Sequence, residues 1–166
     1  EAMETLVHEG ERVSSSAVRE ALDAGDLEHA ERLLGRPYCI SGRVIHGEKL
    51  GRKLGYATAN IQLKRLKAPL SGIFVVTVDG IGEYPLEGVA SLGIRPTVSS
   101  TGVPTLEAYI FDYQGDLYRA HLRVNFLHKL RDEAKFDSLE ALTAQIARDV
   151  FDAKAHHAAL RVQMAD

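Results

Sequence analysis

Residues 42–60 hold the residue types and the spacing that binding a phosphorylated ligand would require. Four of the chain's fourteen glycines fall within these nineteen residues, and Arg52 and Lys53 stand among them. Glycine turns let backbone N–H groups come close to phosphate oxygens, and neighbouring basic side chains neutralise phosphate charge. The stretch therefore predicts a phosphate-binding loop. The competing interpretation is a hairpin loop whose lysines lie in water, and spacing alone leaves both open.

Two neutral oxygen donors follow the glycines. Thr58 and Asn60 are two residues apart, so in an extended segment both side chains point to one face. Neutral oxygens together with phosphate oxygens and water suit Mg²⁺, which rarely needs a full protein cage. The sequence contains neither the P-loop pattern nor the dinucleotide-binding Gly-x-Gly-x-x-Gly pattern. Any nucleotide site here is therefore of another kind.

Glu107 is a candidate proton acceptor within residues 105–111. If this run is a strand, Glu107, Tyr109 and Phe111 share one face, and Leu106 lies on the other. A carboxylate beside two aromatic rings either lies in a site, where it could accept a proton, or is exposed at a rim. The sequence alone leaves both interpretations open.

Composition excludes several classes of protein. The chain has 166 residues, 45% of them apolar and 26% charged, which is typical of one globular domain and excludes collagen-like, coiled-coil and wholly disordered chains. No apolar run reaches the roughly 20 residues of a membrane span, so no membrane partner is expected. The acidic first residues are unlike a secretory signal. Cys39 is the single cysteine and cannot form an internal disulfide, so we expect a cytoplasmic protein.

Charge is unevenly distributed along the chain. Residues 1–36 carry nine acidic and four basic residues, a net charge of −5, whereas residues 43–67 carry seven basic residues and one acidic residue, a net charge of +6. This polarity indicates a local anionic ligand rather than general affinity for nucleic acid. A solvated basic face is the plainer interpretation of the same charges.

The elements that must position these residues are short. Residues 14–35 predict two small helices, with Ser14–Ser16 and Asp26 as N-caps and Gly25 and Gly35 as stops. Short β runs separated by turn residues follow, and they predict a closed or nearly closed antiparallel sheet. These runs are residues 39–45, 73–79, 84–92, 106–113 and 117–126. The last two are expected to pair as a hairpin.

A C-terminal helix completes the predicted architecture. Asp137 and Glu140 have the spacing of a capping box, and an apolar stripe should pack on the barrel wall. The stripe comprises Leu139, Leu142, Ile146 and Val150.

The motifs resemble those of riboflavin kinases. The stretch at residues 42–60 is followed, in that family's order, by motifs at residues 90–97, 106–107, 116–118 and 130–138. The resemblance implies a six-stranded antiparallel Greek-key β-barrel, spanning about residues 37–130 of a kinase domain at 37–166, with a C-terminal helix at about 138–155. Residues 13–19 and 33–38 are similar to the end of the FMN adenylyltransferase module of bifunctional bacterial FAD synthetases. Residues 1–36 would then be a helical remnant of that module.

The resemblance also implies an activity, which is transfer of the ATP γ-phosphoryl group to the riboflavin 5′-hydroxyl to give FMN. Glu107 matches the family's catalytic glutamate. The positions that match ATP and phosphate binding are Gly47, Gly51, Arg52, Thr58 and Asn60. Thr58 and Asn60 would also hold Mg²⁺, and Arg131 and Phe136 match positions near the flavin. Ala57 departs from the family's usual proline, which puts the rigidity of the loop in doubt.

Two other functions remain open at this point. An oligonucleotide-binding barrel would use the basic residues 43–67 and stack a base on Tyr56, but aromatic residues are few there. A flavin-binding barrel without kinase activity would bind FMN and leave ATP unconsumed. On the leading interpretation the substrates are ATP and riboflavin, the partner is an N-terminal FMN adenylyltransferase module, nucleic acid is not bound, and this chain makes no FAD.

Overall fold

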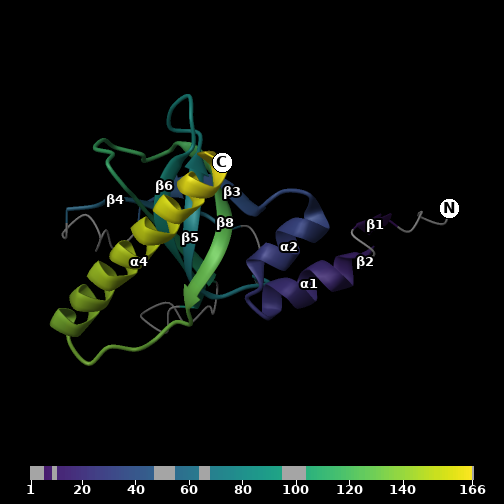
Figure 1. Cartoon of the computed structure of the whole chain (residues 1–166). Helices are drawn as coiled ribbons and strands as arrows, with labels where there is room; N and C mark the ends of the chain where they lie inside the picture. Colours follow the sequence, from purple (N-terminus) through teal and green to yellow (C-terminus); the bar gives the residue numbers. More distant parts are fainter. Residues whose placement is uncertain (1–5, 9–10, 47–54, 64–67, 95–103, 166) are drawn as a thin grey trace.

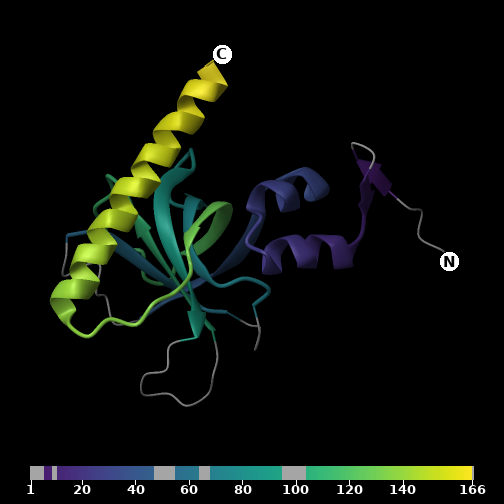
Figure 2. The same cartoon turned by 60° about the horizontal axis from the view of Figure 1, so that its bottom comes forward.

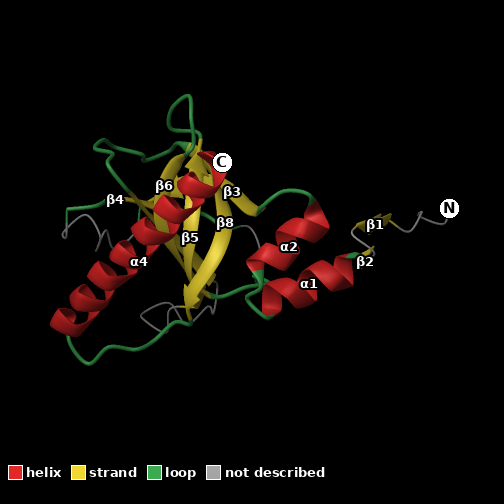
Figure 3. Ribbon diagram, in the orientation of Figure 1, coloured by secondary structure: helices red, strands yellow, loops and turns green. Residues whose placement is uncertain are grey.

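The chain forms a small β-barrel with helices at both ends (Figures 1 and 3). The computed structural model describes residues 6–8, 11–46, 55–63, 68–94 and 104–165. Its elements, in chain order, are β1 (Leu6–His8), β2 (Glu11–Val13), α1 (Ser15–Asp23), α2 (Leu27–Leu34), β3 (Tyr38–Ile45), β4 (Ala57–Ile61), β5 (Gly72–Asp79), β6 (Leu86–Ile94), β7 (Pro104–Ile110), β8 (His121–Arg131) and α4 (Leu139–Ala165).

Six strands close the barrel in the order β3-β4-β7-β6-β5-β8, and all neighbours are antiparallel. β5, β6 and β7 are joined consecutively, and β8 returns to lie beside β5. This arrangement is a Greek key, which confirms the predicted fold class. Closure leaves the barrel without an open sheet edge.

Each barrel strand places alternate residues inside and outside. The inner residues, among them Ala59, Phe74, Leu106 and Phe126, form the main core. A second cluster lies on the outer face, where Val75, Val89 and Phe111 of the barrel meet α4. The inner core and the outer cluster are separate because successive side chains of a strand point to opposite faces of the sheet.

The N-terminal helices follow the predicted capping. The Ser14 hydroxyl accepts a hydrogen bond from the Ala17 N–H group at 3.1 Å, and the Asp26 carboxylate accepts one from the His29 N–H group at 3.1 Å. Gly35 ends α2 in the left-handed conformation at φ 77°, where glycine has no steric penalty. The helix pair packs beside β3 and β8, while the β1–β2 hairpin lies away from the barrel (Figure 1). That hairpin falls in a region predicted to be helical.

Helix α4 is longer than predicted and begins with a different cap. It continues to Ala165 because residues 156–165 contain neither glycine nor proline. Ser138, rather than the predicted Asp137, caps it, because the Ser138 hydroxyl accepts from the Ala141 N–H group at 3.1 Å. Ile146 and Val150 of the predicted stripe are buried, but Leu139 is 65% exposed. Figure 2 shows the C-terminal end of α4 extending past the barrel.

The predicted hairpin of residues 106–113 and 117–126 is wrong. β7 pairs with β4 and β6, whereas β8 pairs with β3 and β5. Between them the chain adopts positive φ at Asp112 (53°) and Arg119 (73°). The Arg119 N–H group then bonds to the Val44 carbonyl at 3.0 Å, which directs the chain to β3. β4 was not predicted as a strand.

Candidate functional site

One row of residues crosses all six strands of the barrel. The register aligns Asn60 of β4 with Glu107 of β7, Glu107 with Ser91 of β6, and Ser91 with Ile73 of β5. The row ends at Ile45 of β3 and at Arg131 of β8. Because residues directly opposite in antiparallel strands share a face, the row runs along the outside of the barrel, the face that α4 covers in part.

Glu107 occupies the centre of this row. It is 1% exposed, and it is one of three buried polar or charged residues among those the structure describes. Its cross-strand neighbours, Asn60 and Ser91, carry an amide and a hydroxyl. The predicted division of faces is confirmed, since Leu106 and Ala108 join the inner core and Tyr109 and Phe111 join the outer cluster. A carboxylate kept at a buried position is costly to the fold, which makes it a candidate for chemistry.

Thr58 and Asn60 share the outer face, as predicted. Thr58 lies opposite Tyr109 and Asn60 lies opposite Glu107, so the amide is the immediate cross-strand neighbour of the carboxylate. Both residues also line a shallow recess at the ends of β3 and β4, together with His46, Asp116 and Tyr118. The His46 and Tyr118 rings stack there at 3.8 Å. Thr58 and Asn60 therefore both border the recess, and Asn60 is also the cross-strand neighbour of Glu107.

The predicted phosphate-binding residues Gly47, Gly51 and Arg52 lie outside the described residues. The described chain stops at His46, at the end of β3, and resumes at Gly55, just before β4. His46, the last described residue before them, lines the recess with Thr58 and Asn60.

The predicted flavin residues Arg131 and Phe136 lie together at the other end of the row. The Arg131 Cζ atom is 5.8 Å from the centroid of the Phe136 ring, within the range of a cation–π contact. The guanidinium also forms two hydrogen bonds to Asp149 of α4, with Nε to Oδ1 at 2.9 Å and Nη2 to Oδ2 at 2.7 Å. β8, which carries Arg131, and β7, which carries Glu107, are three strands apart in either direction around the closed barrel.

The segment after β8 is fixed by a second ion pair. The Lys129 ammonium lies 2.6 Å from the Asp132 carboxylate. Its hydrogen bond, and then its charge, hold the pKa of Asp132 below the usual value for an aspartate. The chain on both sides of Arg131 is therefore held by charged contacts as it leaves the sheet.

Two residues of the site were not found from the sequence. Ser91 became a neighbour of Glu107 only through the β6–β7 register, which sequence spacing does not contain. Asp149 could have been noticed in the sequence, because it falls on the same helix face as the apolar residues Ile146, Val150 and Ala153. An acidic residue on a buried face indicates a buried partner, although the sequence does not say which one.

The described residues contain neither a clustered metal site nor a membrane-spanning helix. Among residues 6–8, 11–46, 55–63, 68–94 and 104–165, no group of three or more His, Cys, Asp or Glu side chains is placed to hold a metal ion. Within the same ranges, no helix has the length and apolar character needed to cross a membrane.

Comparison with known proteins identifies relatives for most of the chain. Residues 34–157 match the family model of flavokinase, described as riboflavin kinase. A bifunctional riboflavin kinase/FMN adenylyltransferase of Pseudomonas fluorescens is 53% identical over 156 residues, which is 93% of this chain and 50% of that protein. The chain spans about half the length of the curated relatives it matches.

Solved structures agree on the fold. A riboflavin kinase from Trypanosoma brucei aligns with a TM-score of 0.51 and 27% identity, covering 72% of this chain and 79% of that one. A structure from Streptococcus pneumoniae described as a macrolide-efflux protein aligns with a TM-score of 0.74 and 35% identity, over 87% of this chain and 47% of that one.

Proposed function

Because this chain belongs to the riboflavin kinase family, we propose that it transfers the γ-phosphoryl group of ATP to the 5′-hydroxyl of riboflavin, giving FMN and ADP. The observation that carries the proposal is the direct cross-strand pairing of Asn60 with Glu107. A candidate ligand of the metal nucleotide and a candidate proton acceptor thus lie on one face, one strand spacing apart, which is about 5 Å.

The reaction requires positioning, charge neutralisation and a proton acceptor. In our proposal the riboflavin oxygen forms a bond to the γ-phosphorus, and the bond from that phosphorus to the β–γ bridging oxygen breaks. The Glu107 carboxylate accepts the hydroxyl proton, and ADP leaves with the bridging oxygen. Asn60 beside Glu107 and Ser91 on its other side keep the carboxylate in a polar environment.

Thr58 and Asn60 are the proposed ligands of Mg²⁺ carried by ATP. Their side-chain oxygens are hard, neutral donors, and they lie together in the recess, which suits a cation whose remaining ligands are phosphates and water. When bound, Mg²⁺ supplies neutralisation of the charge on the transferred phosphoryl group. Gly47, Gly51 and Arg52 are proposed to bind the phosphates, a role that rests on their sequence pattern alone.

Arg131 and Phe136 are proposed to serve the flavin. Riboflavin carries a flat aromatic ring system at one end and a hydroxylated chain at the other. Phe136 and Arg131 lie together on the segment that leaves β8. In our proposal the aromatic end of riboflavin contacts Phe136, and its terminal hydroxyl reaches Glu107.

The remaining assignments depend on sequence alone. Residues 1–36 are proposed to belong to an N-terminal FMN adenylyltransferase module, the partner of the kinase domain in a longer enzyme. We propose that this chain does not adenylylate FMN and does not bind nucleic acid. A cytoplasmic location likewise stays a prediction, based on the single cysteine.

The proposal is tested by identifying the products. The purified chain is incubated with riboflavin, ATP and Mg²⁺, and flavins and nucleotides are separated chromatographically. We expect FMN and ADP in equal amounts and no FAD. Flavin binding without ATP consumption would contradict the proposal and favour a non-catalytic flavin-binding barrel. Salt-dependent binding of single-stranded RNA, without FMN formation, would favour the oligonucleotide-binding alternative.

A further inference from the structure

The guanidinium of Arg131 is already occupied in this structure. Nε and Nη2 donate to the two carboxylate oxygens of Asp149 at 2.9 and 2.7 Å, and Nη1 donates to the Asp132 carbonyl at 3.0 Å. All three nitrogens therefore have acceptors. These bonds use three of the five guanidinium N–H groups.

Asp149 is built into the interface between α4 and the barrel. Its side chain is 7% exposed, and Gln145, one helical turn earlier, donates to Oδ1 at 3.0 Å. The amide and the arginine thus share one carboxylate. A paired fork of this kind fixes the plane of the guanidinium as well as its position.

Apolar packing already joins α4 to the barrel near this point. Ile146, Val150 and Ala153 are buried against β5, β6 and β7 residues of the outer cluster. Replacing a buried ion pair by apolar residues is often neutral or stabilising. Because apolar contacts also attach α4 here, we expect the Asp149–Arg131 pair to fix an orientation as well as an attachment.

The Asp149–Arg131 ion pair lies next to Phe136, the aromatic residue that we propose to contact the flavin. Arg131 is the last residue of β8, and five residues later the half-buried Phe136 ring lies 5.8 Å from its Cζ atom. The guanidinium thus joins Asp149 of α4 to the Phe136 ring. Movement of Arg131 would break its cation–π contact with Phe136.

We propose that Asp149, assisted by Gln145, is a positioning residue for flavin binding, which holds Arg131 and through it the Phe136 ring where that ring can contact the isoalloxazine ring. This inference rests on the proposed function. Asp149 does not touch the substrate in this account. Arg131 acts as the link between helix and ring rather than as a charged ligand of the flavin.

The test is a steady-state comparison of Asp149→Asn with the wild-type chain, with riboflavin and ATP varied separately. The substitution keeps the shape and removes the charge. We expect the KM for riboflavin to rise about tenfold, while the KM for ATP changes by less than about twofold. In a Phe136→Ala background, Asp149→Asn should raise the riboflavin KM by less than about twofold further, because both changes remove one function.

The matched control removes a different contact of α4, about two turns further along the helix. The buried His157 ring bonds to the Gly88 carbonyl of β6 through Nε2 at 3.1 Å. His157→Gln should lower the melting temperature and leave the riboflavin KM unchanged. If α4 packing alone mattered, both substitutions would raise that KM.

Several results would overturn the inference. One is a riboflavin KM that stays unchanged in folded Asp149→Asn. Another is an equal rise of the riboflavin KM and the ATP KM. A third is a further rise of about tenfold in the riboflavin KM when Asp149→Asn is added to Phe136→Ala. If Asp149→Asn fails to fold, Arg131→Lys is the test variant, because lysine keeps the positive charge but cannot form the paired hydrogen bonds to Asp149. We expect Arg131→Lys to raise the riboflavin KM. An unchanged riboflavin KM in this variant would overturn the inference. Absence of FMN from the wild-type chain would instead overturn the proposed function, and this inference with it.

Discussion

A carboxylate removed from water costs the fold free energy, so its position calls for a functional reason. Glu107 is 1% exposed between Asn60 and Ser91. If its task is to accept the hydroxyl proton, the glutamate must be able to ionise, and an amide of the same shape cannot replace it.

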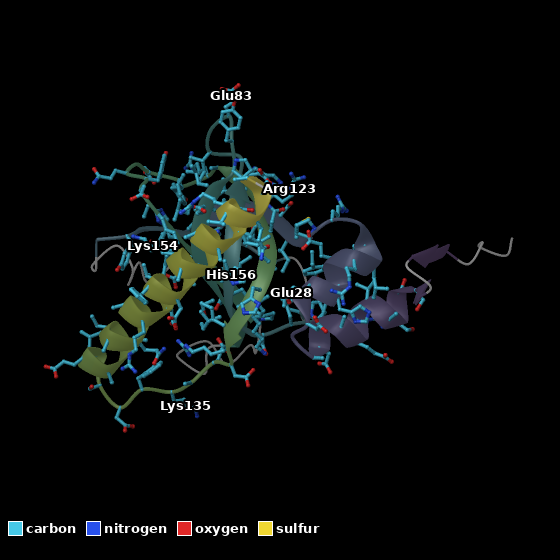
Figure 4. All side chains as sticks on the ribbon, viewed as in Figure 1. Glu28, Glu83, Arg123, Lys135, Lys154 and His156 are labelled. Atoms are coloured by element: carbon cyan, nitrogen blue, oxygen red, sulfur yellow. The ribbon has the colours of Figure 1, made fainter. Side chains whose placement is uncertain are left out.

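Glu107→Gln should lower kcat by about 10²–10⁴-fold, the usual contribution of a general base. The KM for ATP should change by less than about twofold, because the nucleotide ligands remain in place. Steady-state FMN formation measures both quantities. Glu83→Gln, in the exposed turn before β6 (Figure 4), is the charge-matched control and should behave as wild type. A kcat of Glu107→Gln equal to that of the control would remove Glu107 from the mechanism.

Thr58→Ala should increase the Mg²⁺ concentration needed for half-maximal activity by about fivefold or more, because one hard oxygen donor is lost. Thr58→Ser keeps the hydroxyl and should stay close to wild type. The measurement is the rate of FMN formation at fixed ATP over a series of Mg²⁺ concentrations. Identical metal dependence in the alanine and serine variants would show that Thr58 is not a metal ligand.

Among the elements, β6 depends most clearly on the absence of a side chain. A Cβ atom on Gly88 would lie 2.5 Å from the Tyr109 carbonyl oxygen, which is backbone of the neighbouring β7 and cannot rotate away. Strands β6 and β7 would have to separate where the outer cluster meets α4.

Gly88→Ala should destabilise the chain by about 1–3 kcal/mol, in the range of other overpacked positions. The free energy of unfolding in urea measures the effect. Gly82→Ala is the control, because nothing lies within 4 Å of its added Cβ atom. Equal stability of the two variants would contradict the β6–β7 register described here.

The sequence predicts an element well when the residues that determine it lie close together in the chain. Ser14, Asp26 and Gly35 are local caps, and both N-terminal helices were predicted from them. Strand pairing is not local. The turn residues around Gly115 suggested a hairpin, but Arg119 bonds to β3 and takes the chain to the other side of the barrel. β4 is only five residues long and was hidden in the glycine-rich stretch.

The site was predicted to a similar extent and for the same reason. Alternation along one strand placed Thr58 with Asn60, and the register confirms that they share a face. The row that joins Asn60, Glu107 and Ser91 needs three strands in register, and no spacing within one segment encodes it. The partner of Arg131 was equally hidden, since Asp149 is eighteen residues away on a helix.

On the scale of the whole molecule, one polar cluster joins the N-terminal helices, the barrel and α4. The His128 Nδ1 atom of β8 lies 2.6 Å from the Glu28 carboxylate of α2. The His128 ring stacks on His156 of α4, with centroids 4.5 Å apart and planes 12° apart. Figure 4 shows Glu28 and His156 approaching from different elements. Burial, followed by the nearby His128 charge, holds the pKa of His156 below 6.5, and Glu28 opposes this shift only in part.

This cluster predicts loss of stability in mild acid. The unfolded chain takes up a proton at His156 near pH 6.5, whereas the folded chain resists it, so stability is retained above that pH and lost as pH falls through the lower folded pKa. His156→Gln should flatten the decline of melting temperature below pH 7. Exposed His121→Gln should keep the wild-type slope. An unchanged slope in His156→Gln would show that another group titrates.

The most direct test of the whole account is a structure of the chain with FMN and Mg-ADP. We expect the FMN phosphate ester oxygen to lie within hydrogen-bonding distance of Glu107, at about 3 Å, with the metal against Thr58 and Asn60 and the ring system against Phe136. FMN bound elsewhere, for example in the apolar pocket between Tyr38–Ser41 and Ala68–Pro69, would contradict it.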